Sequence, residues 1–381
     1  MAKKTRTGKL EKIPGQYETI SQLMDSLYPT DGEGCPRIQD LHTLTDLFLP
    51  SHSNWEHMRM IRHLYRMTND THLQYYRVMI PKRSGGFRRL DVPTGRIKYC
   101  QEKILEKILS RMSVHPCAKA YVKGTSLRDA AAPHVGKPVV VKLDIHDFYG
   151  TITFGMVYNR VFGEDRFPKK IGMILANLCC CRGVLPQGAP TSPAISNLVM
   201  VPQDEAISAW CAARDITYTR YSDDLIFSGD FEPAELIREV RKLLRRDGFT
   251  LNTGKTRIIR QGRRQIVTGV VVNEKAQLPA EYRRAIRQEV YYCAKYGVRD
   301  HILRSGLTEY IRENGYSEDG KRVMQRSYLY HLLGKIGYAL MIDPDNAEMR
   351  RCRDTVKGIL AAMPPRKRAA EPFDTDEPLP F

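Results

Sequence analysis

The sequence has no long apolar run. None of its stretches reaches the length of about 18 apolar residues that a membrane-spanning helix requires. The N-terminal residues 1–6 are basic, but no apolar segment follows them, as one would in a secretory signal. We therefore expect a cytoplasmic protein.

The sequence also lacks the cysteine pattern of a disulfide framework or a zinc site. Its nine cysteines are an odd number in a long chain, and six of them are scattered singly. The other three, Cys179, Cys180 and Cys181, are consecutive, whereas zinc knuckles space their ligands two residues apart. We interpret these residues as small buried hydrophobes.

Acidic residues are too few to balance the basic ones. The chain has 43 Asp and Glu residues and 60 Lys and Arg residues, which gives a formal net charge of +17. Such an excess indicates a polyanionic partner, most simply nucleic acid, although solvated basic side chains alone would give the same count. The 381 residues suffice for two or three structural units.

The two ends of the chain and its middle differ in pattern. A basic arm and a helical N-terminal region are expected over residues 1–72, where apolar positions recur at helical intervals. The signal is helical again over 273–360, with helices expected at about 300–313 and 321–341, and residues 361–381 are predicted to be a disordered tail. A helix is also predicted over 101–112 and another over 194–213.

Strand patterns dominate the middle of the chain. Residues 74–81 and 88–92 read as a hairpin around a Ser-Gly-Gly turn, and the β-branched run 139–145 contains a carboxylate, Asp144, near its end. A second hairpin, over 218–228, carries adjacent acids, Asp223 and Asp224, at its tip.

These carboxylates suggest a metal site. Adjacent acids in a tight turn repel each other unless a cation lies between them. Two divalent ions in such a site promote in-line phosphoryl displacement, in which one helps to ionise a primer hydroxyl and the other holds a triphosphate. An Asp-Asp pair alone is weak evidence, because such dipeptides are common in turns.

The chain resembles the reverse transcriptase family in six motifs that occur in the family's order. They lie between about residues 79 and 272, roughly half of the chain. In sequence letters they are PKRSGGFRRL (81–90), LDIHDFY (143–149), LPQGAPTSP (185–193), YSDD (221–224), GFTLN (248–252) with Lys255, and VTG (267–269).

The resemblance implies an α+β right-hand polymerase with fingers, palm and thumb. Residues 73–272 would form the fingers and palm around an antiparallel palm sheet, and 273–360 a helical thumb and C-terminal RNA-binding region. Asp144, Asp223 and Asp224 match the palm aspartates that hold two Mg²⁺ ions and catalyse the reaction of dNTP substrates.

Other family positions imply nucleotide contacts. Lys82 and Arg88 match fingers residues that grip the incoming triphosphate, and Lys255 matches a lysine near it. Tyr149 matches the aromatic ring beneath the deoxyribose, where a 2′-hydroxyl would collide, and Gln187 matches a residue near the sugar. Each of these side chains could instead be an ordinary solvated charge or packed ring.

The residues within these motifs resemble those of bacterial retron reverse transcriptases in particular. The stretch LPQGAPTSPA (185–194) and the VTG triplet match that branch. A second retron motif, Asn-Ala-x-x-His, corresponds to residues 130–134, where Ala131 and His134 agree but Ala130 replaces the asparagine. This substitution puts any role of the amide in doubt.

A retron enzyme would bind its own structured non-coding RNA in the bacterial cytoplasm. Synthesis would start from the 2′-hydroxyl of an internal guanosine and leave a branched RNA–DNA product. The family further implies anti-phage defence with a separate effector protein. RNA recognition would involve the following residues: His134, Val267, Thr268, Gly269, Arg283, Arg284 and Arg287.

Two alternatives remain open. The chain could be another bacterial reverse transcriptase, of the group II intron, diversity-generating or abortive-infection type. It could also be a catalytically inactive RNA-binding scaffold, although all three aspartates are present.

Overall fold

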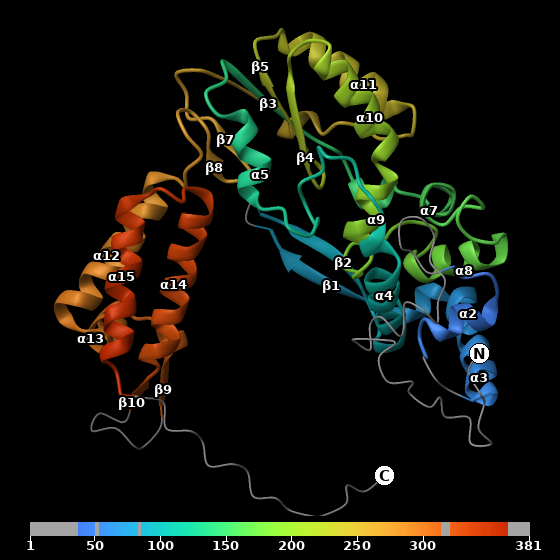
Figure 1. Cartoon of the computed structure of the whole chain (residues 1–381), viewed down its shortest axis with the longest axis horizontal. Helices are drawn as coiled ribbons and strands as arrows, with labels where there is room; N and C mark the ends of the chain where they lie inside the picture. The colour runs from blue at the N-terminus through green and yellow to red at the C-terminus, as the bar shows by residue number, and fades with distance from the viewer. Residues whose placement is uncertain (1–36, 50–52, 83–84, 314–320, 365–381) are drawn as a thin grey trace, which may run out of the picture. The chain divides into compact units, whose positions relative to one another are not determined.

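The computed structural model describes residues 37–49, 53–82, 85–313 and 321–364, and divides the chain into two compact units (Figure 1). Unit 1 comprises Met1–Ser126 and Lys137–Arg260, and unit 2 comprises Leu127–Gly136 and Gln261–Phe381. The predicted basic arm and nearly all of the predicted tail lie outside the described residues.

Unit 1 begins, within the described residues, with two capped helices, α2 (Leu41–Asp46) and α3 (Asn54–Asn69). Each starts with a capping box, in which an N-cap side chain and the side chain three residues later satisfy each other's backbone amides. A single turn of 3₁₀ helix, η1 (Thr71–Gln74), leads on to the first strand. The predicted helical N-terminal region is therefore confirmed over its described part.

A two-stranded hairpin and a helix follow. Strands β1 (Tyr75–Pro81) and β2 (Phe87–Pro93) pair antiparallel, as predicted. Helix α4 (Gly95–Lys107) begins before the predicted start at residue 101, because its buried stripe already starts at Ile97. It ends in a 3₁₀ turn, η2 (Leu109–Arg111).

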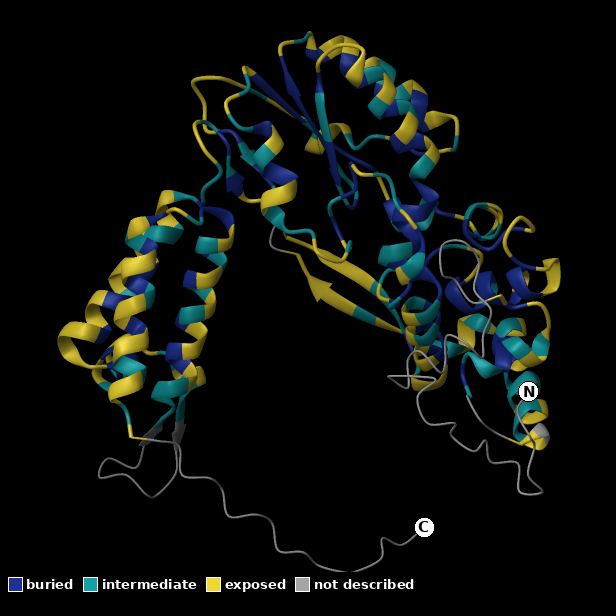
Figure 2. Cartoon of the chain, in the orientation of Figure 1, coloured by how far each residue is buried: buried dark blue, intermediate teal, exposed yellow. Residues whose placement is uncertain are grey.

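The core of unit 1 is a four-stranded antiparallel sheet in the order β4-β5-β3-β6. Its central strand β3 (Val139–Asp144) is buried at every position but one, which explains its unbroken apolar sequence (Figure 2). The other strands are β4 (Thr217–Tyr221), β5 (Asp224–Gly229) and β6 (Arg257–Arg260). The predicted antiparallel palm sheet is confirmed.

Short helices pack around this sheet. The predicted helix over 194–213 is in fact two helices, since Pro202 has no backbone amide to continue the hydrogen-bond ladder through Met200. The helices are α6 (Phe148–Thr151), α7 (Phe154–Val161), α8 (Lys169–Cys179), α9 (Ser192–Val199), α10 (Val201–Ala212) and α11 (Pro233–Arg245), and a 3₁₀ turn η4 (Thr253–Lys255) precedes β6.

Unit 2 is mostly helical. Its main elements are the small hairpin β7 (Ile266–Val267) and β8 (Val270–Val271), α5 (Leu127–Ala131) with η3 (Ala132–His134), α12 (Ala280–Tyr296), α13 (Val298–Arg304), α14 (Gln325–Ile342) and α15 (Ala347–Ala362). Helix α15 reaches residue 362, so the predicted tail begins inside a helix.

The predicted helix over 300–313 is wrong in its second half. Helix α13 ends at Arg304, and Gly306 follows with φ of 62°, a left-handed conformation that stops the helix. Beyond it lie a 3₁₀ turn, η5 (Thr308–Tyr310), and strand β9 (Ile311–Glu313), which pairs with β10 (Lys321–Val323).

The boundary between the units differs from the predicted position at residue 272. Unit 2 begins at Gln261 because the β7–β8 hairpin belongs with the segment Leu127–Gly136. The amide of Gly136 donates to the carbonyl of Val272 at 3.0 Å, which joins the two segments.

Two expectations from composition can be compared with the structure. Eight cysteines lie in the described residues; all are free and buried, as predicted. None of the helices in the described part of the chain is long and apolar enough to cross a membrane.

Candidate active site

Three carboxylates come together at one edge of the unit 1 sheet. Asp144 is the last residue of β3 and lies opposite Asp224, the first residue of β5, in the antiparallel register. The amide of Ile145 donates to the carbonyl of Asp223 at 3.0 Å, so the tight turn between β4 and β5 is held against the end of β3. Ser222 in this turn adopts a left-handed φ of 59°. The predicted convergence of Asp144, Asp223 and Asp224 is thus present.

A lysine joins this cluster from a distant part of the sequence. The Nζ atom of Lys255 donates to Oδ2 of Asp144 at 2.7 Å. The amide of Asn252 donates to the carbonyl of Asp144 at 2.8 Å, which fixes the η4 turn beside the end of β3. The Lys255 side chain is 61% exposed, so its ammonium can move to another anion.

The electrostatics of the cluster favour a bound cation. Burial raises the pKa of Asp223 above its ordinary value, and the nearby charge of Asp144 adds to the shift. Burial also raises the pKa of Asp224, an effect that Lys142 opposes. The hydrogen bond to Asp144 raises the pKa of Lys255. Ionised carboxylates this close together are stabilised by added positive charge.

The donor set fits a divalent metal that shares its coordination with substrate. Among the described residues, no group of three or more His, Cys, Asp and Glu side chains is placed so that it could hold a metal ion by itself. Mg²⁺ characteristically takes one or two carboxylates and completes its shell with phosphates and water, so an open set of hard oxygen donors suits it. Asp144, Asp223 and Asp224 would supply those oxygens.

Tyr149 lies at the same edge. It belongs to α6, which directly follows β3, and its ring contacts Phe148 edge-on with centroids 5.4 Å apart. Burial raises the pKa of Tyr149 well above its ordinary value, and Tyr121 adds to the shift. Ser222 of the carboxylate turn opposes this shift in the Tyr149 pKa. The ring is therefore packed beside the turn rather than solvated.

The loop that contains Gln187 touches the base of the β1–β2 hairpin. The amide of Asp91 donates to the carbonyl of Gln187 at 2.9 Å. Gly188 has φ of 124°, and a Cβ atom there would lie 3.1 Å from the carbonyl oxygen of Asp91, so only glycine fits without strain. Lys82 and Arg88 lie exposed on this hairpin, and among the described residues no ion pair joins either to the aspartates.

A buried ion pair supports the turn from beneath. Arg220 and Asp204 are both 0% exposed, with Nη2 of Arg220 2.6 Å from Oδ2 of Asp204. Arg220 also donates through Nη1 to the carbonyl of Ser222 at 3.2 Å and to Oδ1 of Asn197 at 3.0 Å. The coulombic attraction of Asp204 raises the pKa of Arg220 in spite of its burial. Sequence reasoning missed this network, because both elements contain other polar residues and nothing local singles out Asp204 and Arg220.

Comparison with known proteins agrees with this geometry. The sequence model of the family described as "Reverse transcriptase (RNA-dependent DNA polymerase)" matches residues 80–282, more than half of the chain. The chain belongs to the reverse transcriptase family. The α+β polymerase fold expected from the sequence is thereby confirmed.

Several curated reverse transcriptases are similar to this one, and their names place them in retrons. The Retron Mx65 reverse transcriptase of Myxococcus xanthus is 34% identical over 305 residues, which cover 74% of this chain and 65% of that protein. The Retron Ec83 enzyme of Escherichia coli is 30% identical over 76% of this chain and 90% of its own. The Retron Ec86 enzyme of the same species is 29% identical over 60% and 73%. The match thus spans just under two thirds of the Mx65 protein.

The two retron-like motifs of this reverse transcriptase meet in unit 2. His134 is fully buried in η3, at the end of the segment whose Gly136 bonds to Val272. Thr268 and Gly269 form the β7–β8 turn with φ of 47° and 87°. Val267, just before this turn, is fully buried. Both side chains are therefore packed inside unit 2, and their contact with RNA stays a prediction.

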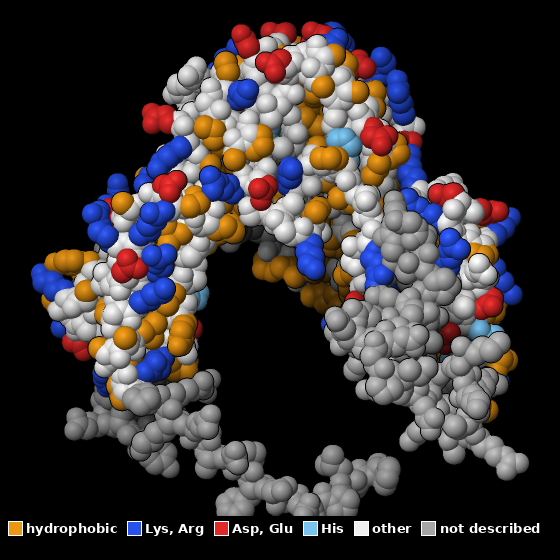
Figure 3. Space-filling view, viewed as in Figure 1, with side chains coloured by type: hydrophobic (Ala, Val, Ile, Leu, Met, Phe, Trp, Pro, Cys, Tyr) orange, Lys and Arg blue, Asp and Glu red, His pale blue; other side chains and the backbone are white. Residues whose placement is uncertain are grey.

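The predicted arginines lie on α12 of unit 2, where Lys and Arg side chains gather over α12 and α15 (Figure 3). Arg287 is held by Glu348 at 2.6 Å, and Nε of Arg283 donates to the carbonyl of Leu278 at 3.2 Å. Arg284 is exposed. Of the three, Arg284 therefore carries the charge that is most accessible to an RNA phosphate.

Proposed function

We propose that this chain is an RNA-directed DNA polymerase of the retron type. The observation that carries the proposal is the placement of Asp144 opposite Asp224, with Asp223 in the adjoining turn, where the two central strands β3 and β5 of the antiparallel sheet meet. The motif order and the similarity to retron enzymes support the same reaction. A scaffold without catalytic activity would have no use for three carboxylates gathered at one point, of which Asp144 is buried and the other two are partly buried.

Asp144, Asp223 and Asp224 would hold two divalent ions, which we infer to be Mg²⁺. When bound, these ions lower the pKa of the primer hydroxyl and neutralise charge on the triphosphate of the dNTP. The carboxylates fix where the nucleophile and the phosphate meet. Lys255 would leave Asp144 and pair with the triphosphate, which its exposure allows.

The remaining nucleotide contacts would come from the hairpin and from Tyr149. Lys82 and Arg88 are exposed cations on a hairpin that Gln187 and Gly188 anchor to the palm, so they can grip a triphosphate. The packed ring of Tyr149 would exclude a 2′-hydroxyl and so select dNTPs.

The partner would be a structured non-coding RNA of the retron. Part of it would serve as template, with synthesis primed from the 2′-hydroxyl of an internal guanosine, giving single-stranded DNA branched from the RNA. We further propose a role in anti-phage defence together with a separate effector protein. The excess positive charge and the retron relatives support the RNA partner.

The polymerase proposal is tested by extension of a DNA primer on an RNA template. The purified wild-type chain should extend the primer with Mg²⁺ and dNTPs, and Asp224→Asn should not. Asp230→Asn is the matched control, because Asp230 is an exposed acid just beyond the other end of β5. Equal extension by all three proteins would refute the catalytic assignment.

The retron type needs a separate test on nucleic acid that copurifies with the chain. Sequencing it should give RNA joined to single-stranded DNA. If RNase and a debranching enzyme leave the size and 5′ end of the DNA unchanged, the branched priming is wrong. DNA attached to the protein itself would instead indicate protein priming by another type of bacterial reverse transcriptase.

A further inference from the structure

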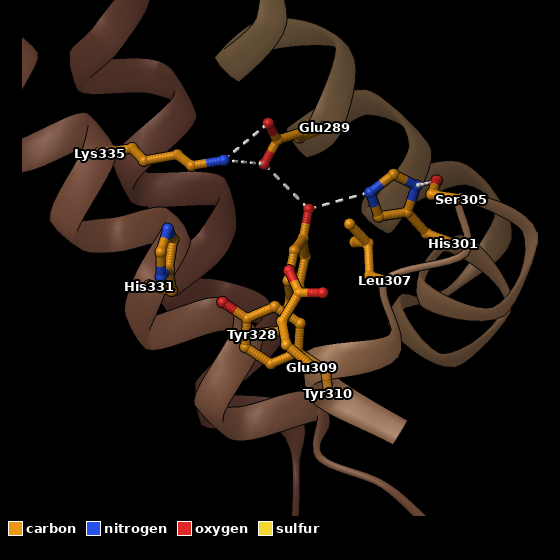
Figure 4. Close-up of a pocket in the computed structure, with 9 residues that line it drawn as sticks. All are labelled: Glu289, His301, Ser305, Leu307, Glu309, Tyr310, Tyr328, His331 and Lys335. Atoms are coloured by element: carbon orange, nitrogen blue, oxygen red, sulfur yellow. Dashed lines mark hydrogen bonds and ion pairs between the residues drawn. The ribbon is translucent and has the colours of Figure 1, made fainter. Parts of the chain in front are cut away.

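Unit 2 contains a cavity that the polymerase reaction does not use. It lies among α12, α13, η5 and α14 and has a volume of ≈ 210 Å³ (Figure 4). Its lining combines aromatic rings with charged groups, which include Tyr310, His331, Glu289, Glu309 and Lys335. We call this cavity the thumb pocket.

A chain of hydrogen bonds at one side of the thumb pocket orients Glu289. The Tyr328 hydroxyl donates to Oε2 of Glu289 at 3.0 Å and lies 2.9 Å from Nε2 of His301. Because the hydroxyl proton is directed at Glu289, Nε2 of His301 must carry a proton and donate to the Tyr328 oxygen. Nδ1 of His301 is then the acceptor for the Ser305 hydroxyl at 3.2 Å. The tautomer follows from these partners.

The same carboxylate is paired with a lysine. Nζ of Lys335 lies 2.9 Å from Oε1 and 3.0 Å from Oε2 of Glu289. Both side chains remain partly exposed, Glu289 at 23% and Lys335 at 31%. A carboxylate accepts about four hydrogen bonds, and Glu289 already accepts these three from Tyr328 and Lys335, so it keeps capacity for one more beside a cationic donor.

The opposite side of the pocket is aromatic. The ring of Tyr310 meets Tyr328 edge-on at 5.2 Å between centroids and meets His331 edge-on at 6.1 Å. Tyr328 is buried, whereas Tyr310 is partly exposed and His331 is exposed. The two outer rings can therefore receive a planar ligand from solvent.

These features select against a phosphate and in favour of a neutral heterocycle. Glu289 and Glu309 outnumber Lys335, so the local charge repels an anion. An unpaired nucleobase is flat, is recognised by stacking on Tyr or His, and is hydrogen-bonded through its Watson–Crick edge. Guanine presents an oxygen acceptor next to N–H donors on that edge, which matches the Lys335 ammonium next to the Glu289 carboxylate.

We propose that the thumb pocket binds a guanine base splayed out from a single-stranded part of the RNA. The proposal rests on the RNA partner of the proposed function and names a base-specific contact for it. It requires no base pairing and no contact with unit 1.

The test measures binding of the full-length chain to fluorescent nine-nucleotide oligouridylates whose central base is varied, without dNTPs. The probe with guanine should bind about tenfold more tightly than those with adenine, cytosine or uracil, the size of one good two-point base contact. Inosine, which lacks the 2-amino group, should bind more weakly than guanine. The 7-deazaguanine probe keeps the paired edge and should bind as guanine does.

Variants locate the contact. Tyr310→Ala should weaken guanine binding roughly tenfold through lost stacking, and His331→Ala should weaken it as well, because the His331 ring meets Tyr310 edge-on and holds it in place. Glu289→Gln should abolish the difference between guanine and inosine. Tyr330→Ala is the matched control: it is 61% exposed and adjacent to His331 on α14, but does not line the pocket. It should bind guanine as the wild type does.

Three results would overturn the proposal: equal binding of all probes by the wild type, equal binding of guanine and inosine, or as large a loss in Tyr330→Ala as in His331→Ala. The comparison of the guanine probe with the other probes on the wild-type chain tests the proposal even if Glu289→Gln does not fold. Asp224→Asn, which should not extend a primer, should keep the guanine preference. The experiment therefore distinguishes a failure of the guanine-binding proposal from a failure of the polymerase assignment.

Discussion

The buried pair of Arg220 and Asp204 allows a quantitative prediction. Asp204→Asn removes a negative charge that accepts from Nε and Nη2 of Arg220 and from the Tyr218 hydroxyl, at 2.6–3.1 Å. Both charged side chains are 0% exposed, so the guanidinium would remain buried without its counter-charge. Loss of one partner of such a pair costs about 3–5 kcal/mol. At about 2–4 °C per kcal/mol, the midpoint of thermal unfolding of unit 1 should fall by roughly 6–20 °C.

Urea unfolding followed by tryptophan fluorescence measures this effect. Trp210 lies on α10 with Asp204, whereas Trp55 is 69% exposed and should change little on unfolding. Glu235→Gln is the matched control. Glu235 lies on the neighbouring helix, α11, and forms an exposed ion pair with Arg214 at 3.8 Å. The control should cost less than about 1 kcal/mol.

A double variant separates stability from positioning. Asp204→Leu with Arg220→Met leaves no unpaired charge, so it should be more stable than Asp204→Asn alone. It still lacks the donor to the carbonyl of Ser222, so primer extension should remain slow. A loss under about 1 kcal/mol in Asp204→Asn would refute the buried pair, and wild-type activity in the double variant would refute its support of the turn.

Three further predictions concern the nucleotide site, the loop and pH. Tyr149→Ala should raise incorporation of ribonucleotides relative to dNTPs, measured by single-nucleotide extension; unchanged discrimination would contradict the steric role of the ring. Gly188→Ala should destabilise the chain by about 1–3 kcal/mol because of its φ of 124°, which urea unfolding measures. Burial lowers the pKa of His301 below 6.5; as pH falls below about 6.5 the unfolded chain binds a proton that the folded chain resists. The free energy of unfolding should therefore decrease as the pH is lowered through that range, and it should decrease less in His301→Gln. Equal pH profiles for the wild type and this variant would contradict the role of His301.

The carboxylate edge was predictable because its signals are local. A β-branched run that ends on Asp144 predicts a buried strand, and Asp223 with Asp224 between two strand patterns predicts a hairpin tip. The family's motif order then indicated that the two would meet, as the register of β3 and β5 shows.

Contacts between distant residues were not predictable in the same way. Lys255 and Asp144 are separated by 111 positions. Nothing in the sequence of the η4 segment shows that the ammonium of Lys255 reaches the carboxylate of Asp144. The pairing of Arg220 with Asp204 likewise depends on how α10 packs on β4. The end of α13 was missed because the helical spacing of apolar residues continues past Gly306, while the backbone there turns into a strand.

The central claim is that Asp144, Asp223 and Asp224 form a polymerase centre, and RNA-templated primer extension by Asp144→Asn tests it most directly. Loss of a metal-binding carboxylate removes several kcal/mol of transition-state stabilisation, so the rate with Mg²⁺ and dNTPs should fall at least about 10³-fold, while folding and RNA binding are retained. Extension at the wild-type rate by this variant would contradict the account.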